Sequence, residues 1–308
     1  MKYKNIIFII FIIFIIFILY YSFFNKYIEN FEDKFDFDEK YEEIYDPQFV
    51  DLYEIVYREF SDINIDTKIV DSKTLDKMDI TNVHYLVCGS GVGKLCKKLK
   101  EKFKNVTGVD ISENMLKKSQ SLYPNIKFVK GNIIKKNIFN NNQFTHIYID
   151  ERTLYYNKID TFDQIFNNIY TWLKEDGYMI VPIYDPSKLQ LASRYYSSKY
   201  MDDKGNFHGF TYLNNFSHDC YYIKEGDNSE IFNYYDKVIF DTGDKIIKKT
   251  VFYIPNKEKV YDIILHNGFE VAHIEDIRLQ VVGGYQLAIF KKKKNKITVE
   301  ELEKKNNV

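Results

Sequence analysis

The sequence predicts an α/β fold with a parallel sheet, because two strand-like runs flank a glycine-rich turn and a helix pattern. Residues 83–88 form a short apolar run without a turn-forming residue, which is typical of a strand buried on both faces of a parallel sheet. Gly89, Gly91 and Gly93 follow this run and precede a helical spacing of leucines. A second apolar run at 105–109 ends in Asp110. Strand, turn, helix and strand in this order favour neighbouring parallel strands.

The glycine turn and Asp110 together predict a nucleoside-binding site. Glycines at alternate positions permit a tight turn and a close approach of the backbone to a ligand. A carboxylate at the tip of the next strand can accept hydrogen bonds from both hydroxyls of a ribose. The dinucleotide pattern G-x-G-x-x-G would place its third glycine at position 94, which is Lys94. The spacing therefore disfavours NAD, and a NAD-binding oxidoreductase remains the weaker alternative.

The pattern G-x-G-x-G, continued by Gly-Val-Asp-Ile-Ser-Glu-Asn-Met-Leu at 108–116, resembles the cofactor half of class I S-adenosylmethionine (SAM)-dependent methyltransferases. The resemblance covers residues 47–290 and implies a Rossmann-like sheet of seven strands whose last strand is antiparallel. It implies that the glycine loop holds the methionine end of SAM and that Asp110 holds the ribose. The cofactor residues that it implies are Gly89, Ser90, Gly91, Gly93, Asp110, Ile111, Met115, Asn132, Ile133 and Asp150.

Two positions depart from the family's pattern. Asn132 stands where the family usually has Asp for the adenine amino group, but its amide oxygen can accept the same bond, and Ile133 can donate its backbone N–H. Val87 stands where the family commonly has an acid that helps hold the methionine ammonium, so we expect weaker binding. A catalytically inactive methyltransferase fold that serves as a membrane scaffold is the second alternative.

The N-terminal stretch predicts a membrane anchor. Residues 6–24 contain no charged residue and would form a helix about 28 Å long, close to the hydrocarbon thickness of a bilayer. The stretch exceeds a usual signal-peptide core, and no small-x-small cleavage site follows it. We expect an anchor at 6–24 and a solvated acidic linker at 25–46. Lysines on both sides of the stretch leave its orientation in the membrane open. The three cysteines show no pairing pattern and so suit a reducing compartment, and SAM is a cytosolic metabolite. We therefore expect a single-pass membrane protein whose domain faces the cytosol.

The remaining elements continue the alternation of strands and helices. A helix from Pro47 is expected to close over cofactor and substrate, as the resemblance implies. The pattern then predicts helix 113–122 with Ser112 as N-cap, strands 126–130 and 144–149, helix 160–174 with Gly177 at C′, strand 178–184, helix 257–266 and strands 269–274 and 284–290. Alternating segments within 186–255 predict an antiparallel substrate-lid insertion over the carboxyl ends of the sheet. Residues 291–308 are expected to form a charged, solvated tail.

The loop after strand 144–149 is the expected transfer site, because ligands bind outside the carboxyl ends of parallel strands. It resembles the corresponding motif of small-molecule methyltransferases, in which an aromatic pair lines the site, here Tyr155 and Tyr156. We expect the insertion to add Tyr212, His208 or His218, of which His218 is the favoured catalytic candidate. A hydroxyl or a neutral imidazole could orient the acceptor and receive its proton.

Composition narrows the function further. The net charge of −1 provides no global electrostatic case for nucleic acid. The six histidines and three cysteines show no H-x-x-x-H or C-x-x-C spacing, so no metal site is predicted. The sequence therefore predicts a SAM-dependent methyltransferase that acts on a small or lipid-like acceptor at a membrane surface, with its oligomeric state open.

Overall fold

The computed structural model describes residues 14, 15, 18, 45, 47–56, 63–75, 78–186, 198–201, 207–213, 216–226, 230–279 and 282–294. The chain divides into two units, Met1–Glu39 and Lys40–Val308, and all that follows concerns the second. No helix among the described residues has the length and apolar character needed to cross a membrane. Apart from three positions, the predicted anchor at 6–24 lies outside the described residues, so it stays a prediction.

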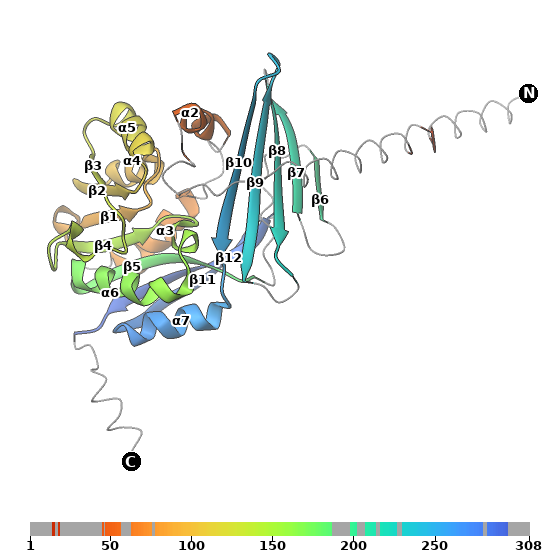
Figure 1. The fold of residues 1–308 in the computed structure, drawn as a ribbon. Coiled ribbons are helices and arrows are strands. Elements are labelled where there is room, and N and C mark those ends of the chain that lie inside the picture. The colour runs from red at the N-terminus through yellow and green to blue at the C-terminus, as the bar shows by residue number, and fades with distance from the viewer. Residues whose placement is uncertain are drawn as a thin grey trace, which may run out of the picture. The chain divides into compact units, whose positions relative to one another are not determined.

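A seven-stranded sheet forms the centre of the second unit (Figure 1). Its strands are β1 (His84–Cys88), β2 (Asn105–Asp110), β3 (Lys127–Lys130), β4 (Phe144–Ile149), β5 (Leu173–Tyr184), β11 (Phe269–Leu279) and β12 (Val282–Lys292). Their order is β11-β12-β5-β4-β1-β2-β3. The strands β1 to β5 pair in parallel, whereas β12 is antiparallel to both β5 and β11. The predicted seven-stranded sheet with an antiparallel last strand is confirmed.

Helices cover both faces of this sheet, because successive side chains of a buried strand point to opposite sides. Leu86 and Cys88 of β1 pack in one apolar core with residues of α6 (Phe162–Trp172) and α7 (Lys257–His266). Tyr85 and Val87 pack in a second core with residues of α3 (Ile63–Thr74) and α4 (Lys94–Lys100). Figure 1 shows α6 and α7 together on one side of the sheet. The alternation explains why the run 83–88 contains almost no polar side chain.

One helix was predicted correctly from the sequence, and another was not predicted. Helix α5 (Glu113–Leu122) has the predicted bounds, and the hydroxyl of Ser112 accepts a hydrogen bond from the backbone N–H of Met115 at 3.3 Å. Helix α3 was not predicted, because its 12 residues are mostly polar; among its described side chains, Val70 and Ile69 pack in the core. Its presence adds a helix between the N-terminal segment and β1.

The prediction that a helix runs to residue 174 with Gly177 at C′ is wrong. The helix α6 ends at Trp172, and Leu173 is already extended. Asp176 takes the left-handed conformation with φ 58°, whereas Gly177 is not among the residues with positive φ. A Cβ on Gly177 would lie 2.9 Å from the backbone oxygens of Lys174 and Thr145. Gly177 is therefore required by the close approach of β4 to β5.

The insertion forms a separate five-stranded antiparallel sheet. Its strands are β6 (Ser198–Met201), β7 (Phe207–Leu213), β8 (Phe216–Lys224), β9 (Ile231–Phe240) and β10 (Lys245–Tyr253). They follow one another in the sheet in chain order, as an antiparallel meander does. Strand β6 was not predicted. The edge strand β10 packs against the short helix η4 (Thr153–Tyr156), which follows β4.

The first residues of the predicted tail belong to the fold. Strand β12 continues to Lys292, whose side chain is buried and donates to the backbone oxygen of Leu173 at 2.7 Å. Burial lowers the pKa of this ammonium group. Lys291 forms an ion pair with Asp176 at 2.9 Å. The expectation of a solvated tail from residue 291 is therefore wrong for these two lysines, and residues 295–308 lie outside the described residues.

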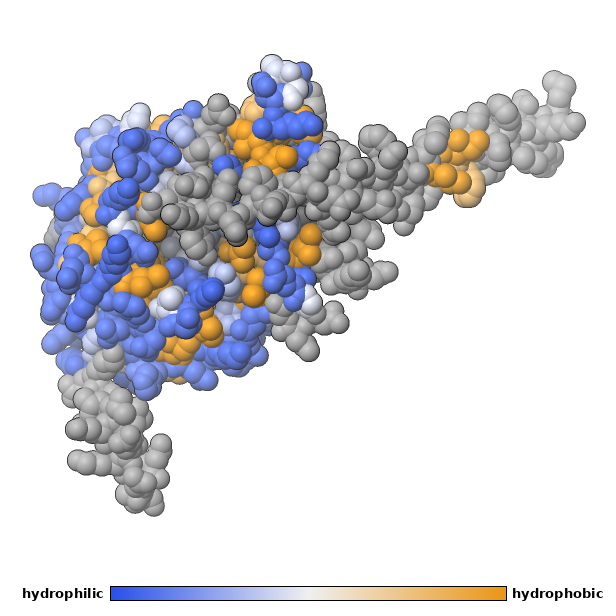
Figure 2. All heavy atoms as spheres, in the orientation of Figure 1, coloured by the Kyte–Doolittle hydropathy of each residue, from blue (hydrophilic) through white to orange (hydrophobic). Residues whose placement is uncertain are grey.

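The surface visible in Figure 2 is mostly hydrophilic around α6 and α7, with apolar residues in small patches. Exposed apolar side chains of the described residues in this part of the chain include Leu265, Val271 and Ile274. Apolar residues scattered in this way are ordinary for a protein surface.

Candidate functional site

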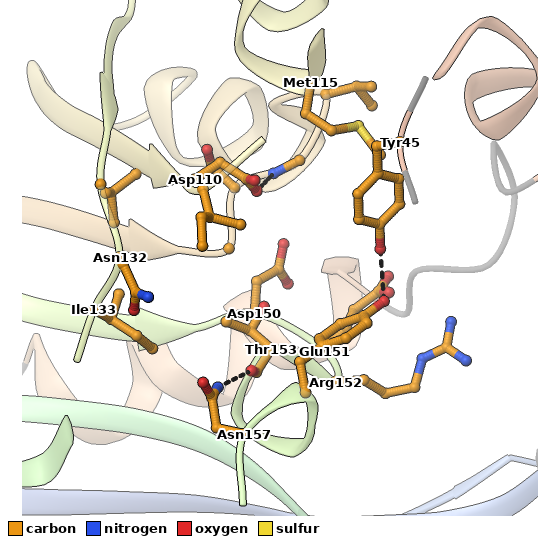
Figure 3. A pocket seen from close by; sticks show the side chains of 18 of the residues that line it. Tyr45, Asp110, Met115, Asn132, Ile133, Asp150, Glu151, Arg152, Thr153 and Asn157 are labelled. Carbon is orange, nitrogen blue, oxygen red and sulfur yellow. Dashed lines mark hydrogen bonds between the residues drawn. The ribbon is translucent and has the colours of Figure 1, made fainter. Parts of the chain in front are cut away.

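A cavity of about 260 Å³ opens at the carboxyl ends of β1, β2 and β4. The strand order reverses at β1, which lies between β2 and β4, and ligands of open α/β sheets bind at such a reversal. The residues that line the cavity are Tyr45, Tyr53, Gly89, Ser90, Gly91, Val92, Lys94, Val109, Asp110, Ile111, Met115, Gly131, Asn132, Ile133, Ile134, Asp150, Glu151, Arg152, Thr153, Tyr156 and Asn157. Figure 3 shows Asn132 and Ile133 on one side, Tyr45 on the other and Asp150 between them.

The three glycines after β1 have different roles. Gly91 has φ 50°, and a Cβ added there would meet no atom within 4 Å, so its backbone faces open space in the cavity. A Cβ on Gly89 would lie 1.8 Å from the hydroxyl oxygen of Thr153, on the loop after β4. A Cβ on Gly93 would lie 2.8 Å from the ring of Phe128. Gly93 does not line the cavity, and its role is to let α4 begin close to β3.

Asp110 presents a carboxylate that the backbone already holds in place. Its Oδ2 accepts from the N–H of Gly91, and its Oδ1 accepts from the N–H of Ser112, each at 2.8 Å. Burial raises the pKa of this carboxyl, and the backbone donors partly oppose that shift. Each carboxylate oxygen retains a further lone pair, so the side chain can accept two hydroxyl groups of a ligand.

The opposite side of the cavity is formed by the turn after β3. The side-chain oxygen of Asn132 accepts from the backbone N–H of Ile134 at 3.0 Å, which leaves it one further lone pair. The buried Asn168 of α6 donates its side-chain N–H to the backbone oxygen of Ile133 at 2.9 Å. These bonds give the turn a defined shape beside the apolar side chains of Ile111 and Ile133.

The loop after β4 brings charged and aromatic groups to the cavity. The backbone N–H of Asp150 donates to the carbonyl of Cys88 at 2.9 Å, so this loop is tied to the end of β1. The next residue, Glu151, has φ 39°, an uncommon conformation for a residue with a side chain. The guanidinium of Arg152 lies over the rings of Phe252 and Tyr234, at 5.1 and 5.7 Å from their centroids. Arg152 thus connects the loop to the insertion.

The N-terminal segment covers the same cavity. The hydroxyls of Tyr45 and Tyr156 form a hydrogen bond of 2.6 Å, and the side chain of Asn114 on α5 donates to the backbone oxygen of Tyr45 at 2.9 Å. Helix α2 (Pro47–Val56) packs through Val50 against Val92 and Met115. The helix predicted from Pro47 is therefore present next to the cavity.

The structure brings most of the predicted cofactor residues together. Gly89, Ser90, Gly91, Asp110, Ile111, Met115, Asn132, Ile133 and Asp150 all line the one cavity, and Gly93 is the exception. Val87 points away from it, because its side chain packs in the core beneath α3 and α4. The acid that the family carries at this position has no direct counterpart here, and Asp150 and Glu151 are the nearby carboxylates that line the cavity.

The predicted catalytic residues are divided between the cavity and the core. Tyr156 lines the cavity, but Tyr155 is buried, donates to the backbone oxygen of Pro182 at 3.2 Å and accepts from the N–H of Tyr184 at 3.0 Å. His218 lies on β8, and its Nε2 is 2.7 Å from Asp236 on β9. Neither Tyr155 nor His218 reaches the cavity. Strand β9 separates β8 from the edge strand that packs on η4. The side chains of His208 and Tyr212 lie outside what the structure describes.

Several cavity residues were not predicted. They are Tyr45, Tyr53, Val92, Lys94, Val109, Gly131, Ile134, Glu151, Arg152, Thr153 and Asn157. The four loop residues could have been found from their position directly after a parallel strand, the same signal that selected Asp150 and Tyr156. Tyr45 has no such signal, since it lies in a stretch whose acidic composition indicates a linker.

These residues fit SAM. A backbone that leaves open space at Gly91, beside a partly buried carboxylate with spare lone pairs, suits the methionine end and the ribose of a nucleoside cofactor. The apolar side chains of Ile111, Ile133 and Met115 suit a purine ring. The glycine loop does not match the pyrophosphate-binding pattern of dinucleotide sites, because Lys94 stands in place of the third glycine.

Comparisons with known proteins agree with this geometry. A family model described as a methyltransferase domain matches residues 86–177. A protein of Geobacillus sp. (strain WCH70) that is named as a methyltransferase is 31% identical over 105 residues, which cover 33% of this chain and 42% of that protein. The matched segment thus spans less than half of that relative's length.

Solved structures of SAM-dependent methyltransferases share the fold. One from Clostridium acetobutylicum is 18% identical with a TM-score of 0.64, over 80% of this chain and 98% of that one. SAM-bound CalS10, an amino pentose methyltransferase from Micromonospora echinaspora, is 13% identical with a TM-score of 0.62, over 79% and 97%. The sugar N-methyltransferase KedS8 from Streptoalloteichus is 12% identical with a TM-score of 0.61, over 85% and 97%. The chain has the class I methyltransferase fold, and the comparisons support SAM as its cofactor.

Proposed function

We propose that this domain is a SAM-dependent methyltransferase for a small or lipid-like acceptor bound between the loop after β4 and the insertion. One observation supports this most strongly. A single cavity is lined by residues of the glycine loop, by Asp110 and by residues of the loop 150–157. Nucleoside-binding and acceptor-binding groups are therefore within one space, as a direct transfer requires.

The cofactor, when bound, supplies a methyl group on a positively charged sulfur. Asp110 accepts the ribose hydroxyls, and Asp150 offers a carboxylate to the methionine ammonium in place of the acid that Val87 replaces. Tyr45 and Tyr53 line the cavity from the N-terminal side. The ordinary pKa of tyrosine is about 10, so the hydroxyl of Tyr156 is protonated at neutral pH, and burial raises this pKa further. Tyr156 therefore orients an acceptor and does not act as a base.

Similar folds support a small acceptor. CalS10 is an amino pentose methyltransferase and KedS8 a sugar N-methyltransferase, and both share the fold at low identity. The cavity volume of about 260 Å³ lies below the usual range of roughly 300–1,000 Å³ for small-molecule sites, so the cavity has no room for a large acceptor. Action at a membrane surface is supported by the uncharged residues 6–24 alone.

Thermal shift and calorimetry on the full chain with SAM, S-adenosylhomocysteine (SAH) and NAD test the cofactor. We expect SAM and SAH to raise the melting temperature and NAD to leave it unchanged. An incubation with SAM and pooled cell extract, monitored by release of SAH, tests for turnover. Binding without turnover would favour the inactive scaffold, and a response to NAD alone would favour an oxidoreductase.

We also propose that residues 6–24 anchor the domain to a membrane with the domain on the cytosolic side. The support is the uncharged stretch in the sequence and three buried free cysteines, Cys88, Cys96 and Cys220, which suit a reducing compartment. Flotation of the full chain with lipid vesicles, compared with a chain that lacks residues 1–28, tests the anchor. Protease protection of the domain in sealed membranes tests the orientation, and equal flotation of both chains would contradict the anchor.

A further inference from the structure

We infer that the acceptor is an amine that enters the cavity as an ammonium ion, and that Glu151 is the residue that receives it. This inference deepens the proposed function and rests on it. It begins from the end of β4, where one loop supplies both a carboxylate and an aromatic wall. The carboxylate is that of Glu151, and the wall includes Tyr156.

The backbone of Glu151 is held in a conformation that most side chains avoid. Its φ of 39° lies in the left-handed region, which glycine or asparagine adopts at lower cost. Among the described residues, none forms a hydrogen bond or an ion pair with its carboxylate. An unfavourable backbone conformation that points an unpaired acid at a cavity is an arrangement found at functional sites.

Aromatic rings surround this carboxylate. Tyr45, Tyr53 and Tyr156 line the same cavity, and Tyr45 and Tyr156 share a hydrogen bond. Figure 3 shows Glu151 near the hydroxyl end of Tyr45. The charge of Glu151 contributes to the raised pKa values of both Tyr53 and Tyr156, for which burial is the largest cause. A carboxylate among aromatic faces favours a cation, because both attract positive charge.

The guanidinium of Arg152 opposes this preference only in part, although its charge lowers the pKa values of Tyr53 and Tyr156 that Glu151 raises. Figure 3 shows the side chain of Arg152 extending away from the centre of the cavity, and its guanidinium lies over Phe252 and Tyr234 of the insertion. Three carboxylates line the cavity, those of Asp110, Asp150 and Glu151, against two cationic side chains, those of Lys94 and Arg152. A carboxylate acceptor would therefore be placed among groups of its own charge. The arrangement therefore disfavours an acidic acceptor and favours an amine.

The chemistry requires that the ammonium lose a proton before its nitrogen can react. The carboxylate of Glu151 takes that proton, so that an N–H bond breaks, an O–H bond forms and the nitrogen regains its lone pair. This pair forms the new N–C bond, while the electrons of the broken C–S bond stay on sulfur and yield SAH. The positive charge moves from sulfur to the N-methylammonium product, and the proton on Glu151 leaves to solvent.

Three probes of similar size test the inference, because they differ in charge. Benzylamine, benzyl alcohol and benzoate are titrated by calorimetry into the full chain in the presence of saturating SAH. We expect benzylamine to bind at least tenfold more tightly than the other two. The variant Glu151→Gln should lower the affinity for benzylamine at least tenfold and leave that for benzyl alcohol within twofold.

Control variants separate this effect from damage to the fold. Glu151→Asn suits the left-handed backbone, and it should fold and lose the preference for benzylamine in the same way. Glu270→Gln removes an exposed carboxylate on β11 and should change none of the three affinities. The SAH affinity of Glu270→Gln should equal that of the wild type, and the SAH affinity of each Glu151 variant is measured first so that SAH is saturating in every titration.

The outcomes distinguish two kinds of failure. SAH binding without a preference for benzylamine, or an unchanged preference in both Glu151 variants, would overturn this inference alone. Failure of the wild-type protein to bind SAH would overturn the proposed function and this inference with it.

Discussion

Asp110 shows how a single residue connects the loop geometry to binding. Its two carboxylate oxygens organise the backbone of Gly91 and Ser112 before any ligand is present. The same oxygens have lone pairs left for a ribose. Because burial raises its pKa above the ordinary 3.8, the charged form that accepts these bonds is lost at a higher pH than for an exposed aspartate.

We predict that Asp110→Ala weakens SAH binding at least tenfold, since bonds to a charged group contribute about 1.5–3 kcal/mol. Calorimetry at several pH values adds a second test. The affinity of the wild type should fall with decreasing pH as Asp110 is protonated, and that of Asp110→Ala should lack this dependence. An unchanged affinity in the variant would remove Asp110 from the site.

At Val87, introducing the acid that the family carries at this position is expected to be harmful. A carboxylate at this position would lie in the core beneath α3 and α4, where Val87 is fully buried. We predict that Val87→Asp lowers the free energy of unfolding by about 3 kcal/mol or more without improving SAH affinity. Denaturant unfolding measures the loss, and Val87→Ala, with a cost of about 2 kcal/mol, separates buried charge from lost volume. Tighter SAH binding would show that the side chain reaches the ligand.

At the scale of elements, a buried histidine joins α3 to the sheet. The Nε2 of His146 on β4 lies 3.0 Å from the hydroxyl of Thr74 on α3, and the ring stacks on Tyr85, whose centroid is 4.6 Å away. The Thr74 hydroxyl donates to the carbonyl of Val70 at 2.8 Å, so Nε2 is the donor in the pair. Burial lowers the pKa of His146 to about 3, and the ring is neutral in the folded protein.

This neutral ring makes stability depend on pH. Between the unfolded pKa of about 6.5 and the folded value near 3, the unfolded chain binds a proton that the folded chain does not, so stability falls as pH falls. We predict a loss of about 2 kcal/mol from this residue between pH 7.5 and 5. In denaturant unfolding, His146→Gln should lack that component, and the exposed His266→Gln should keep it. Parallel curves for wild type and His146→Gln would contradict the assignment.

At the scale of the whole molecule, the N-terminal boundary of the domain matters. Tyr45 lies in the segment predicted as a linker, yet its hydroxyl bonds to Tyr156 and its ring lines the cavity. We predict that deletion of residues 1–28 leaves SAH affinity unchanged. Deletion of residues 1–46 should weaken it by roughly three- to tenfold, because one hydrogen bond contributes about 1 kcal/mol and the cavity loses part of its cover.

Calorimetry on both truncated chains tests this boundary. Tyr45→Phe in the full chain is the matched control, because it removes the hydroxyl and keeps the ring. It should reproduce only the part of the loss that comes from the hydrogen bond. Aggregation of the chain that lacks residues 1–28 would show that the N-terminal stretch belongs to the fold.

The sequence by itself determined the elements whose signals are local. The apolar run before Gly89, the position of Asp110 and the bounds of α5 all depend on residues close together in the chain. A hydrophobic period, a capping hydroxyl or a glycine turn acts over one or two turns of backbone, so it can be recognised without the rest of the molecule. The seven-stranded sheet and its antiparallel last strand were predicted from these elements together with the family resemblance.

Only the tertiary structure decided which side chains meet in the cavity. Tyr155 and Tyr156 are adjacent in η4, and the direction of that short helix places one in the core and the other in the site. Tyr45 and Glu151 come to the cavity from segments more than a hundred positions apart. His218 remains outside it, because its strand is not the one that packs on η4. Such contacts depend on the packing of elements that are distant in the chain, and local sequence patterns do not predict that packing.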